Sequence, residues 1–358
     1  PLNYAELSFA GSTSACTKTF ADGTTKVEQE ISLTDDITLT GSSAYAVTVQ
    51  VTSPGVGGTA SRVFLISGYG KTIEISNMTI KGGDINDDGA GIFLYNGATL
   101  NIENTNISGS KAYYGGGIYN FGCTLTILNS TISGNSSYQG GGIYDENFFS
   151  SPTLSVANST ISGNTTSGEG GGIYLNSSGT VTISNSTIAN NHSDNDDSGD
   201  ETGGGIYLEG HVLTVSNSII ADNYRGSSTS TADDYYYNAG TLTDNGYNVV
   251  KYQQGASNQF TATSSNNNIL YNGSSWFNHD VADLGNLNLL PALADNGGPT
   301  ETLALTAGSF AAASISSGIP PAINWNNSPQ IGSEYTDQRG IVRTSGQNTS
   351  IGAYSDNY

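Results

Sequence analysis

The stretch that decides the fold is GGGIYN at residues 115–120, because the chain returns to this pattern several times. It stands again at 140–145 (GGGIYD), 170–175 (GGGIYL) and 203–208 (GGGIYL), with a weaker copy, GAGIFL, at 89–94. Aligned on the third glycine, neighbouring copies lie about 25 to 33 residues apart. A recurring distance in this range is typical of a repeat architecture, in which each copy is one structural unit.

A second block alternates with the glycine block along the chain. Its copies are ISNMTI, IENTNI, ILNSTI, VANSTI, ISNSTI and VSNSII, which close on isoleucines from Ile80 to Ile220. Between the blocks, pairs such as Leu125 and Ile127 alternate with polar residues, which indicates short strands with one buried face. No segment has helical periodicity. We therefore predict an all-β chain that forms one parallel β-helix, a solenoid of about ten coils stacked about 4.8 Å apart.

Stacked coils bring equivalent residues above one another, so the repeats predict three ladders. We expect an asparagine ladder whose amides hydrogen-bond to each other, an inward isoleucine ladder and an outward aromatic ladder. The glycines are expected to form a turn with positive φ that lies close to the neighbouring coil. The ladder residues are Asn77, Asn104, Asn129, Asn158, Asn185 and Asn217; Ile118, Ile143, Ile173 and Ile206; and Phe93, Tyr119, Tyr144, Tyr174 and Tyr207.

Composition excludes several partners. The chain has 10 Lys and Arg against 31 Asp and Glu, a formal net charge of −21. Such a chain repels nucleic acid and anionic membrane surfaces, and no apolar run is long enough for membrane insertion. The start at PLNYAEL has no basic and apolar leader, so we expect an exported protein whose signal is already removed, with a cytosolic protein as the alternative. The two cysteines, Cys16 and Cys123, are expected to be free thiols, although a disulfide between them stays open.

The repeats resemble those of bacterial extracellular right-handed β-helix proteins with polymorphic-outer-membrane-protein-like repeats. The later sequence strengthens this resemblance: LLPALADNGGPTETLALTAGSFAAAS from Leu289, TDQRGIVR from Thr336 and SIGAY from Ser350 are similar to the closing region of the choice-of-anchor subgroup. The resemblance covers about residues 60–358 and implies a right-handed solenoid on the cell surface or secreted. Members often end in an anchoring tail, whereas this chain ends in SDNY, which leaves assembly or release as the expectation.

The repeat pattern divides the chain into three parts. We predict an N-terminal cap with the first strands at 1–60, regular β-helix repeats at 61–225, and irregular C-terminal coils with a closing region at 226–358. A β-helix leaves unpaired backbone groups at each end, so an uncapped end favours end-to-end self-association.

Two acidic segments are candidate calcium sites. DINDDG and DNDDSGDE place oxygen-bearing side chains at alternating positions, as in the first half of a calcium loop. The glutamate that would complete an EF-hand is replaced by Tyr95, so a solvated acidic loop is the alternative. The candidate ligands are Asp84, Asn86, Asp88, Asp194, Asp196, Ser198 and Asp200.

Catalytic residues do not converge clearly in the sequence. A polysaccharide lyase needs a basic residue beside carboxylates, and a glycosidase needs two carboxyl groups. Only a few residues of this sequence suit either reaction. They are Lys81 and Lys111 near Asp84, Asp87 and Asp88, and Asp145, Glu146 and Glu209 after the glycine blocks. His192, His211 and His279 are expected on the surface, and no catalytic residue is assigned.

The sequence favours a non-catalytic structural or surface protein that assembles into an extracellular filament or layer. The alternative is a glycan-binding adhesin that uses the outward tyrosines, and a polysaccharide lyase or glycosidase is the third possibility.

Overall fold

The computed structural model describes residues 16–27, 30–51, 61–147, 153–199, 201–227, 231–255, most of 257–277 and 292–304, and isolated positions between 330 and 338. Strands and turns account for all regular structure in these residues, so the predicted all-β class is confirmed. In this part of the chain there is no helix of the length and hydrophobicity needed to cross a membrane.

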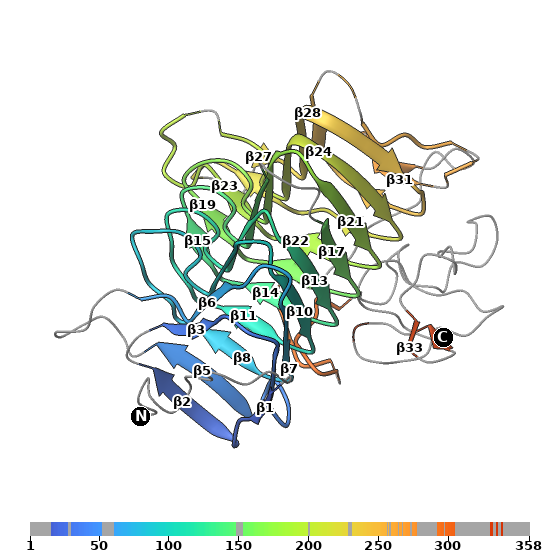
Figure 1. The fold of residues 1–358 in the computed structure, drawn as a ribbon. Helices are drawn as coiled ribbons and strands as arrows, with labels where there is room; N and C mark the ends of the chain where they lie inside the picture. The colour runs from blue at the N-terminus through green and yellow to red at the C-terminus, as the bar shows by residue number, and fades with distance from the viewer. Residues whose placement is uncertain are drawn as a thin grey trace.

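The strands stack in parallel along three long faces and one short face (Figure 1). The first face contains β3 (Ile31–Leu33), β6 (Phe64–Ser67), β9 (Ile92–Tyr95), β12 (Ile118–Phe121), β16 (Ile143–Asn147) and β20 (Ile173–Ser177). The second contains β1 (Cys16–Thr19), β4 (Ile37–Thr40), β7 (Thr72–Ser76), β10 (Thr99–Glu103), β13 (Thr124–Leu128), β17 (Thr153–Ala157) and β21 (Thr180–Ser184). The longer strands β24 (Ile206–Ser216) and β28 (Tyr235–Asp244) pass from the first face to the second, and β30 (Gln253–Gln254) pairs with β28.

The third face contains β2 (Gly23–Val27), β5 (Val47–Val51), β8 (Thr79–Lys81), β11 (Asn106–Ser108), β14 (Thr131–Ser133), β18 (Thr160–Ser162), β22 (Thr187–Ala189), β25 (Ile219–Ile220), β29 (Val249–Val250), β31 (Ile269–Tyr271) and β32 (Trp276–Phe277). The short face contains β15 (Ser136–Ser137), β19 (Thr165–Thr166), β23 (His192–Ser193), β26 (Tyr224–Arg225) and β27 (Thr231–Ala232). A separate antiparallel pair joins β33 (Gln330–Ile331) to β34 (Glu334–Tyr335). The described residues form about 7 turns of a right-handed solenoid, fewer than the about ten coils expected for the whole chain.

Apolar residues at alternating positions fill the interior. On the second face Leu100, Leu125 and Leu154 are consecutive register partners, and each is at most 1% exposed. The same core includes Ile118 and Ile143 of the first face, which are also direct register partners. Because strand residues alternate between faces, each inward residue is followed by one that points outward.

The glycine triplet makes the turn that enters the first face. Gly115 adopts φ of 60°, and a Cβ atom on it would lie 2.4 Å from the carbonyl oxygen of Ile118. A Cβ on Gly116 would lie 2.5 Å from the Ser136 oxygen, and one on Gly117 would lie 2.5 Å from the Gly142 oxygen, both in the next coil. Each position therefore excludes a side chain, the first for conformation and contact and the other two because the coils approach closely.

The stack continues past the predicted boundary near residue 60. Strands β1 to β5 lie in register below β6 to β8, and Phe20 is only 4% exposed at the N-terminal end of the stack. Figure 1 shows this end at the bottom and β28 at the top. At the other end, β27 and β32 run antiparallel to their neighbours, which ends parallel stacking on two faces.

Candidate functional site

The aromatic ladder lies on the outer side of the first face. Tyr119, Tyr144, Tyr174 and Tyr207 occupy successive register positions, opposite in direction to the isoleucines. These four residues are only 3 to 9% exposed. The rings of Tyr144 and Tyr174 are 4.9 Å apart and 3° from parallel, and those of Tyr174 and Tyr207 are 5.0 Å apart and 6° from parallel. The ring faces therefore contact each other, and the open sugar platform expected from the sequence is not formed by this ladder.

Two glutamates accept hydrogen bonds from hydroxyl groups of the tyrosine ladder. Tyr119 donates a hydrogen bond to Glu146, and Tyr174 donates one to Glu209. Asn176 Nδ2 donates to Glu146 Oε1 and to the Tyr144 hydroxyl, each at 2.9 Å. Burial raises the pKa of Tyr119 and of Tyr174, and the hydrogen bond to a glutamate raises it further, so both phenols stay neutral. Glu146 and Glu209, two candidate catalytic carboxylates, are thus bound into the ladder.

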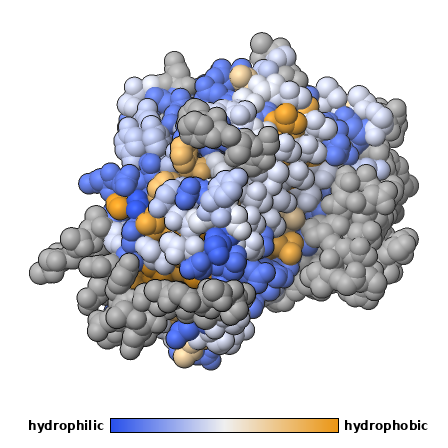
Figure 2. All heavy atoms as spheres, viewed as in Figure 1, coloured by the Kyte–Doolittle hydropathy of each residue, from blue (hydrophilic) through white to orange (hydrophobic). Residues whose placement is uncertain are grey.

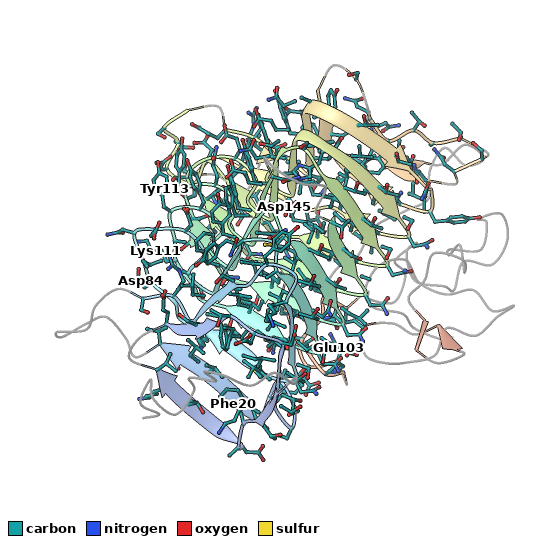
Figure 3. The ribbon with its side chains drawn as sticks, in the orientation of Figure 1. Phe20, Asp84, Glu103, Lys111, Tyr113 and Asp145 are labelled. Carbon is teal, nitrogen blue, oxygen red and sulfur yellow. The ribbon has the colours of Figure 1, made fainter. Side chains whose placement is uncertain are left out.

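Two tyrosines outside the ladder are exposed. Tyr113 is 51% exposed and Tyr138 is 40% exposed, and their rings stack 5.4 Å apart at 21°. Tyr114 supports both, because its ring meets Tyr113 edge-on at 4.6 Å and stacks on Tyr144 at 4.8 Å. Figure 3 shows Tyr113 on the same side of the molecule as Asp84 and Lys111. Among the described residues, the Tyr113 and Tyr138 pair is the most exposed pair of stacked aromatic rings.

An arginine holds the first predicted calcium loop. Arg62, which is 7% exposed, pairs with Asp87 at 3.0 Å and with Glu30 at 2.9 Å, and its Nε donates to the Asp88 carbonyl oxygen at 3.2 Å. Burial and the neighbouring Asp87 raise the pKa of Asp88 to about 6. Asp84 forms backbone bridges to neighbouring coils. The arginine cation therefore already neutralises part of this acidic segment.

Asn86 of the same loop is exposed. The predicted ligands of the second loop differ in exposure: Asp194 is 5% exposed, whereas Asp196 and Ser198 are exposed. The Ser198 amide donates a hydrogen bond to Asp196 Oδ1 at 3.1 Å. Asp200 lies outside the described residues. Within the described ranges, no three His, Cys, Asp or Glu residues are grouped so as to hold a metal ion. Calcium binding by the alternating sets stays a prediction.

The predicted asparagines occupy left-handed turn positions between the second and third faces. All six have φ between 47° and 57°, a conformation that asparagine tolerates better than other residues with a side chain. The amide of Asn104 donates to Asn77 at 3.2 Å, and that of Asn158 donates to Asn129 at 3.4 Å. Asn129, Asn158 and Asn185 are at most 3% exposed, so their Asn-Ser-Thr sequences are inaccessible to glycosylation in the folded chain.

A second, stronger asparagine ladder was missed by the sequence reasoning. Asn135 donates to Asn164 at 3.0 Å, Asn164 to Asn191 at 2.9 Å, and Asn191 to Asn223 at 2.9 Å. The ladder ends on Asp234, which accepts from Asn223 Nδ2 at 2.8 Å. The signal in the sequence was the asparagine three residues after the closing isoleucine, in ISGN, IANN and IADN.

A polar cluster inside the solenoid was also missed. His211 is 0% exposed, and its Nε2 lies 3.0 Å from Oδ2 of Asp145, which is 3% exposed. Asn120 donates to the other Asp145 oxygen and to the Cys123 carbonyl oxygen. The expectation of a surface histidine is therefore wrong for His211, because Gly210 turns it into the interior while the strand continues.

His192 and Cys123 are both shielded from solvent, to different extents. His192 is half-buried, its Nε2 contacts the Gly226 carbonyl oxygen, and His279 lies outside the described residues. Cys123 is a buried free thiol whose pKa is raised by burial to about 11, so it is not a thiolate nucleophile.

The C-terminal motifs fold back onto the solenoid. Gln338 of the TDQRG motif donates to the Ser130 carbonyl oxygen at 3.1 Å and accepts from the Thr160 hydroxyl at 2.7 Å. Thr300 of NGGPT donates to the Asn129 carbonyl oxygen at 3.1 Å, and it accepts from Gln338 at 2.7 Å. The two motifs thus meet on the turn between the second and third faces.

Comparison with known proteins agrees with this geometry. The chain matches the family described as the right-handed beta helix region over residues 63–280, which is more than half of its 358 residues. No curated protein and no solved structure matches it. The matched segment begins at the strand β6 and ends just beyond β32, and the stack continues before it through β1 to β5. The chain therefore belongs to the family of right-handed β-helix proteins.

Proposed function

We propose that this chain is a non-catalytic, exported structural protein of a cell surface or extracellular layer. The observation that carries the proposal is that the three candidate catalytic carboxylates after the glycine blocks make structural contacts. Glu146 binds Tyr119 and Asn176, Glu209 binds Tyr174, and Asp145 lies against His211 inside the solenoid. A general acid or base must be free to meet a substrate, and these groups are not. The resemblance of the repeats to polymorphic-outer-membrane-protein-like proteins supports the surface location.

The surface itself agrees with a solvated extracellular rod. Figure 2 shows hydrophilic and intermediate residues over most of the viewed face, with hydrophobic residues scattered between them. The net charge of −21 keeps separate rods apart along their sides, so association would have to use the ends. End-to-end assembly into a filament therefore remains part of the proposal.

The two ends differ in their suitability for assembly. At the C-terminal end, the antiparallel strands β27 and β32 interrupt parallel stacking. At the N-terminal end, β1 and β2 each pair with one described neighbour, and exposed Lys26 lies on β2. Lysine on an edge strand discourages indiscriminate pairing but is compatible with an acidic partner surface.

Negative-stain electron microscopy of the purified protein tests the assembly. We expect ordered filaments that shorten or disappear in Lys26→Glu, because the substitution adds repulsion at the N-terminal edge. Lys111→Glu, on the flank, is the matched control and should leave filaments unchanged. Isolated rods at all concentrations would contradict assembly, and cleavage of a polysaccharide panel by the purified chain would contradict the non-catalytic assignment.

A second candidate function, glycan binding, is favoured by the exposed Tyr113 and Tyr138 pair. Aromatic side chains supply rigid contact area at low entropic cost, although here each ring covers one face of the other. Retention on immobilised polysaccharides, lost in the double variant Tyr113→Ala with Tyr138→Ala, would support the adhesin function over the purely structural one.

A further inference from the structure

Two carboxyl groups face each other in the loop that follows β23. Asp194 is 5% exposed, and its Oδ1 atom has no hydrogen-bond partner among the described residues. Glu201 Oε2 is likewise buried and unpartnered within the part of the chain that the structure describes. The carboxyl groups of Asp194 and Glu201 are within hydrogen-bonding reach of each other, so two acceptors meet there unless a proton or a cation lies between them.

The environment of this pair is acidic. Burial raises the pKa of Glu201, and the nearby carboxyl groups of Asp194 and Glu169 add to the rise. Glu169 accepts a hydrogen bond from Gln139. In the described ranges none of these three carboxyl groups forms an ion pair. Like charges in contact are unfavourable unless a proton or a cation lies between them.

The backbone holds the pair in place. The Asp194 amide donates to the Gly168 carbonyl oxygen at 3.2 Å, and the Asp197 amide donates to the Asp194 carbonyl oxygen at 3.3 Å. A Cβ on Gly199 would lie 2.4 Å from both carboxylate oxygens of Glu201. The absence of a side chain at Gly199 therefore allows the Glu201 carboxylate to fold back toward Asp194.

We propose that a calcium ion binds between the carboxylates of Asp194 and Glu201. The donors are all oxygen atoms, which suits a hard divalent cation, and among the described residues no ion pair balances their negative charge. This site differs from the alternating set expected from the sequence, because it replaces exposed Asp196 with Glu201. It stands independently of the proposed structural function.

Tyr138 provides an optical probe of the site. The carboxyl groups of Glu169, Glu201 and Asp196 act electrostatically on its phenol, so the ring lies near the loop. Terbium(III) takes calcium sites with oxygen ligands and emits when a neighbouring tyrosine is excited. Terbium titrated into the purified full chain should give saturable emission that calcium displaces, and calcium should raise the melting temperature relative to a chelator.

Matched variants locate the ion. Asp194→Asn and Glu201→Gln should each weaken terbium binding at least tenfold, whereas Asp196→Asn should leave it unchanged. Tyr138→Phe should lower the emission without changing the affinity. Far-UV circular dichroism checks folding, and Glu201→Gln decides the result if Asp194→Asn does not fold.

Three outcomes would overturn the proposal. Absence of saturable terbium emission, or of any calcium effect on melting, would mean that the two carboxyl groups share a proton. Full affinity in Glu201→Gln would place the ion elsewhere. Equal loss in Asp196→Asn would assign binding to the exposed loop and not to the buried pair.

Discussion

At the residue scale, the glycine triplet is required by three separate contacts. Gly115 needs positive φ, whereas Gly116 and Gly117 need the absence of Cβ because carbonyl oxygens of the next coil lie where it would be. The triplet also continues the ladder of backbone hydrogen bonds, since the Gly117 amide donates to the Gly141 oxygen at 3.1 Å. The glycine triplet is thus a packing motif.

Gly116→Ala should destabilise the chain by about 3 kcal/mol, because its Cβ would overlap backbone atoms of the coil above. Gly134→Ala is the comparison, because a Cβ there meets nothing within 4 Å and only the left-handed conformation, φ of 63°, costs about 1 kcal/mol. Urea unfolding of the two variants measures the difference. Equal losses would mean that conformation, and not close approach, requires the triplet.

The buried pair of Asp145 and His211 gives a second prediction at this scale. His211→Ala leaves the Asp145 carboxylate buried with Asn120 as its remaining described donor, which should cost about 3 to 5 kcal/mol. The register partner of Asp145 in the next coil is Leu175, so a leucine fits at this position. The double variant Asp145→Leu with His211→Leu should recover most of the loss in thermal or urea unfolding. A double variant less stable than His211→Ala would refute this account.

At the element scale, the ladders have direction. In the strong asparagine ladder each side-chain amide donates to the next ladder residue toward the C-terminal end of the stack, so the last residue must supply an acceptor. Asp234 does this: Oδ1 accepts from the Asn223 amide and Oδ2 from the Tyr252 backbone amide at 2.8 Å. The Asp234 carboxyl group thus supplies the acceptors with which the ladder ends.

Asp234 should make stability depend on pH. Burial raises its pKa from 3.8 to about 8, against the hydrogen bonds from Asn223, which lower it. The folded chain then holds a proton that the unfolded chain releases, so the free energy of unfolding falls as pH rises from about 4 to about 8. In Asp234→Asn this fall should be smaller. The melting temperature measured across that range tests it.

The upper half of this pH range is the most specific to Asp234, because burial raises the pKa of neighbouring Asp233 only to about 6. Asp196→Asn, at an exposed position, is the control and should keep the slope of the unaltered chain. An unchanged slope in Asp234→Asn between pH 6 and 8 would show that the carboxyl group does not carry this proton.

At the scale of the whole molecule, the returning C-terminal segment joins residues that are far apart in the chain. Gln338 contacts Ser130, Thr131 and Thr160 on one side and Thr300 on the other. It therefore connects two closing motifs to two successive coils through one side-chain amide. Tyr45 lies near the same segment: burial and Asp295 raise its pKa to about 12.

Gln338→Ala should loosen this segment without unfolding the solenoid. The amides of Ala294 and Thr302, which bond to each other's carbonyl oxygens, should exchange hydrogen about tenfold faster, because the interactions that hold them to the stack are lost. Gln259→Ala, at an exposed position, is the control. Unchanged exchange in Gln338→Ala would mean that the segment is held by other contacts.

The repeat period determined the solenoid from sequence alone, because stacking forces equivalent residues into register and therefore makes them recur. The same logic located the left-handed asparagines, the isoleucines of the core and the tyrosines of the outer side of the first face. It did not reveal that the tyrosines are covered, since burial of an outward residue depends on neighbouring coils and turns.

Only the tertiary structure decided which polar residues meet. Asp145 and His211 are 66 positions apart by their numbers, and Gln338 is 208 positions from Ser130. The period predicts neighbours one coil away, whereas a side chain that crosses the interior or a segment that folds back obeys no period. Irregular partners such as Asp194 and Glu201 therefore depend on the path of a turn, which spacing in the sequence does not determine.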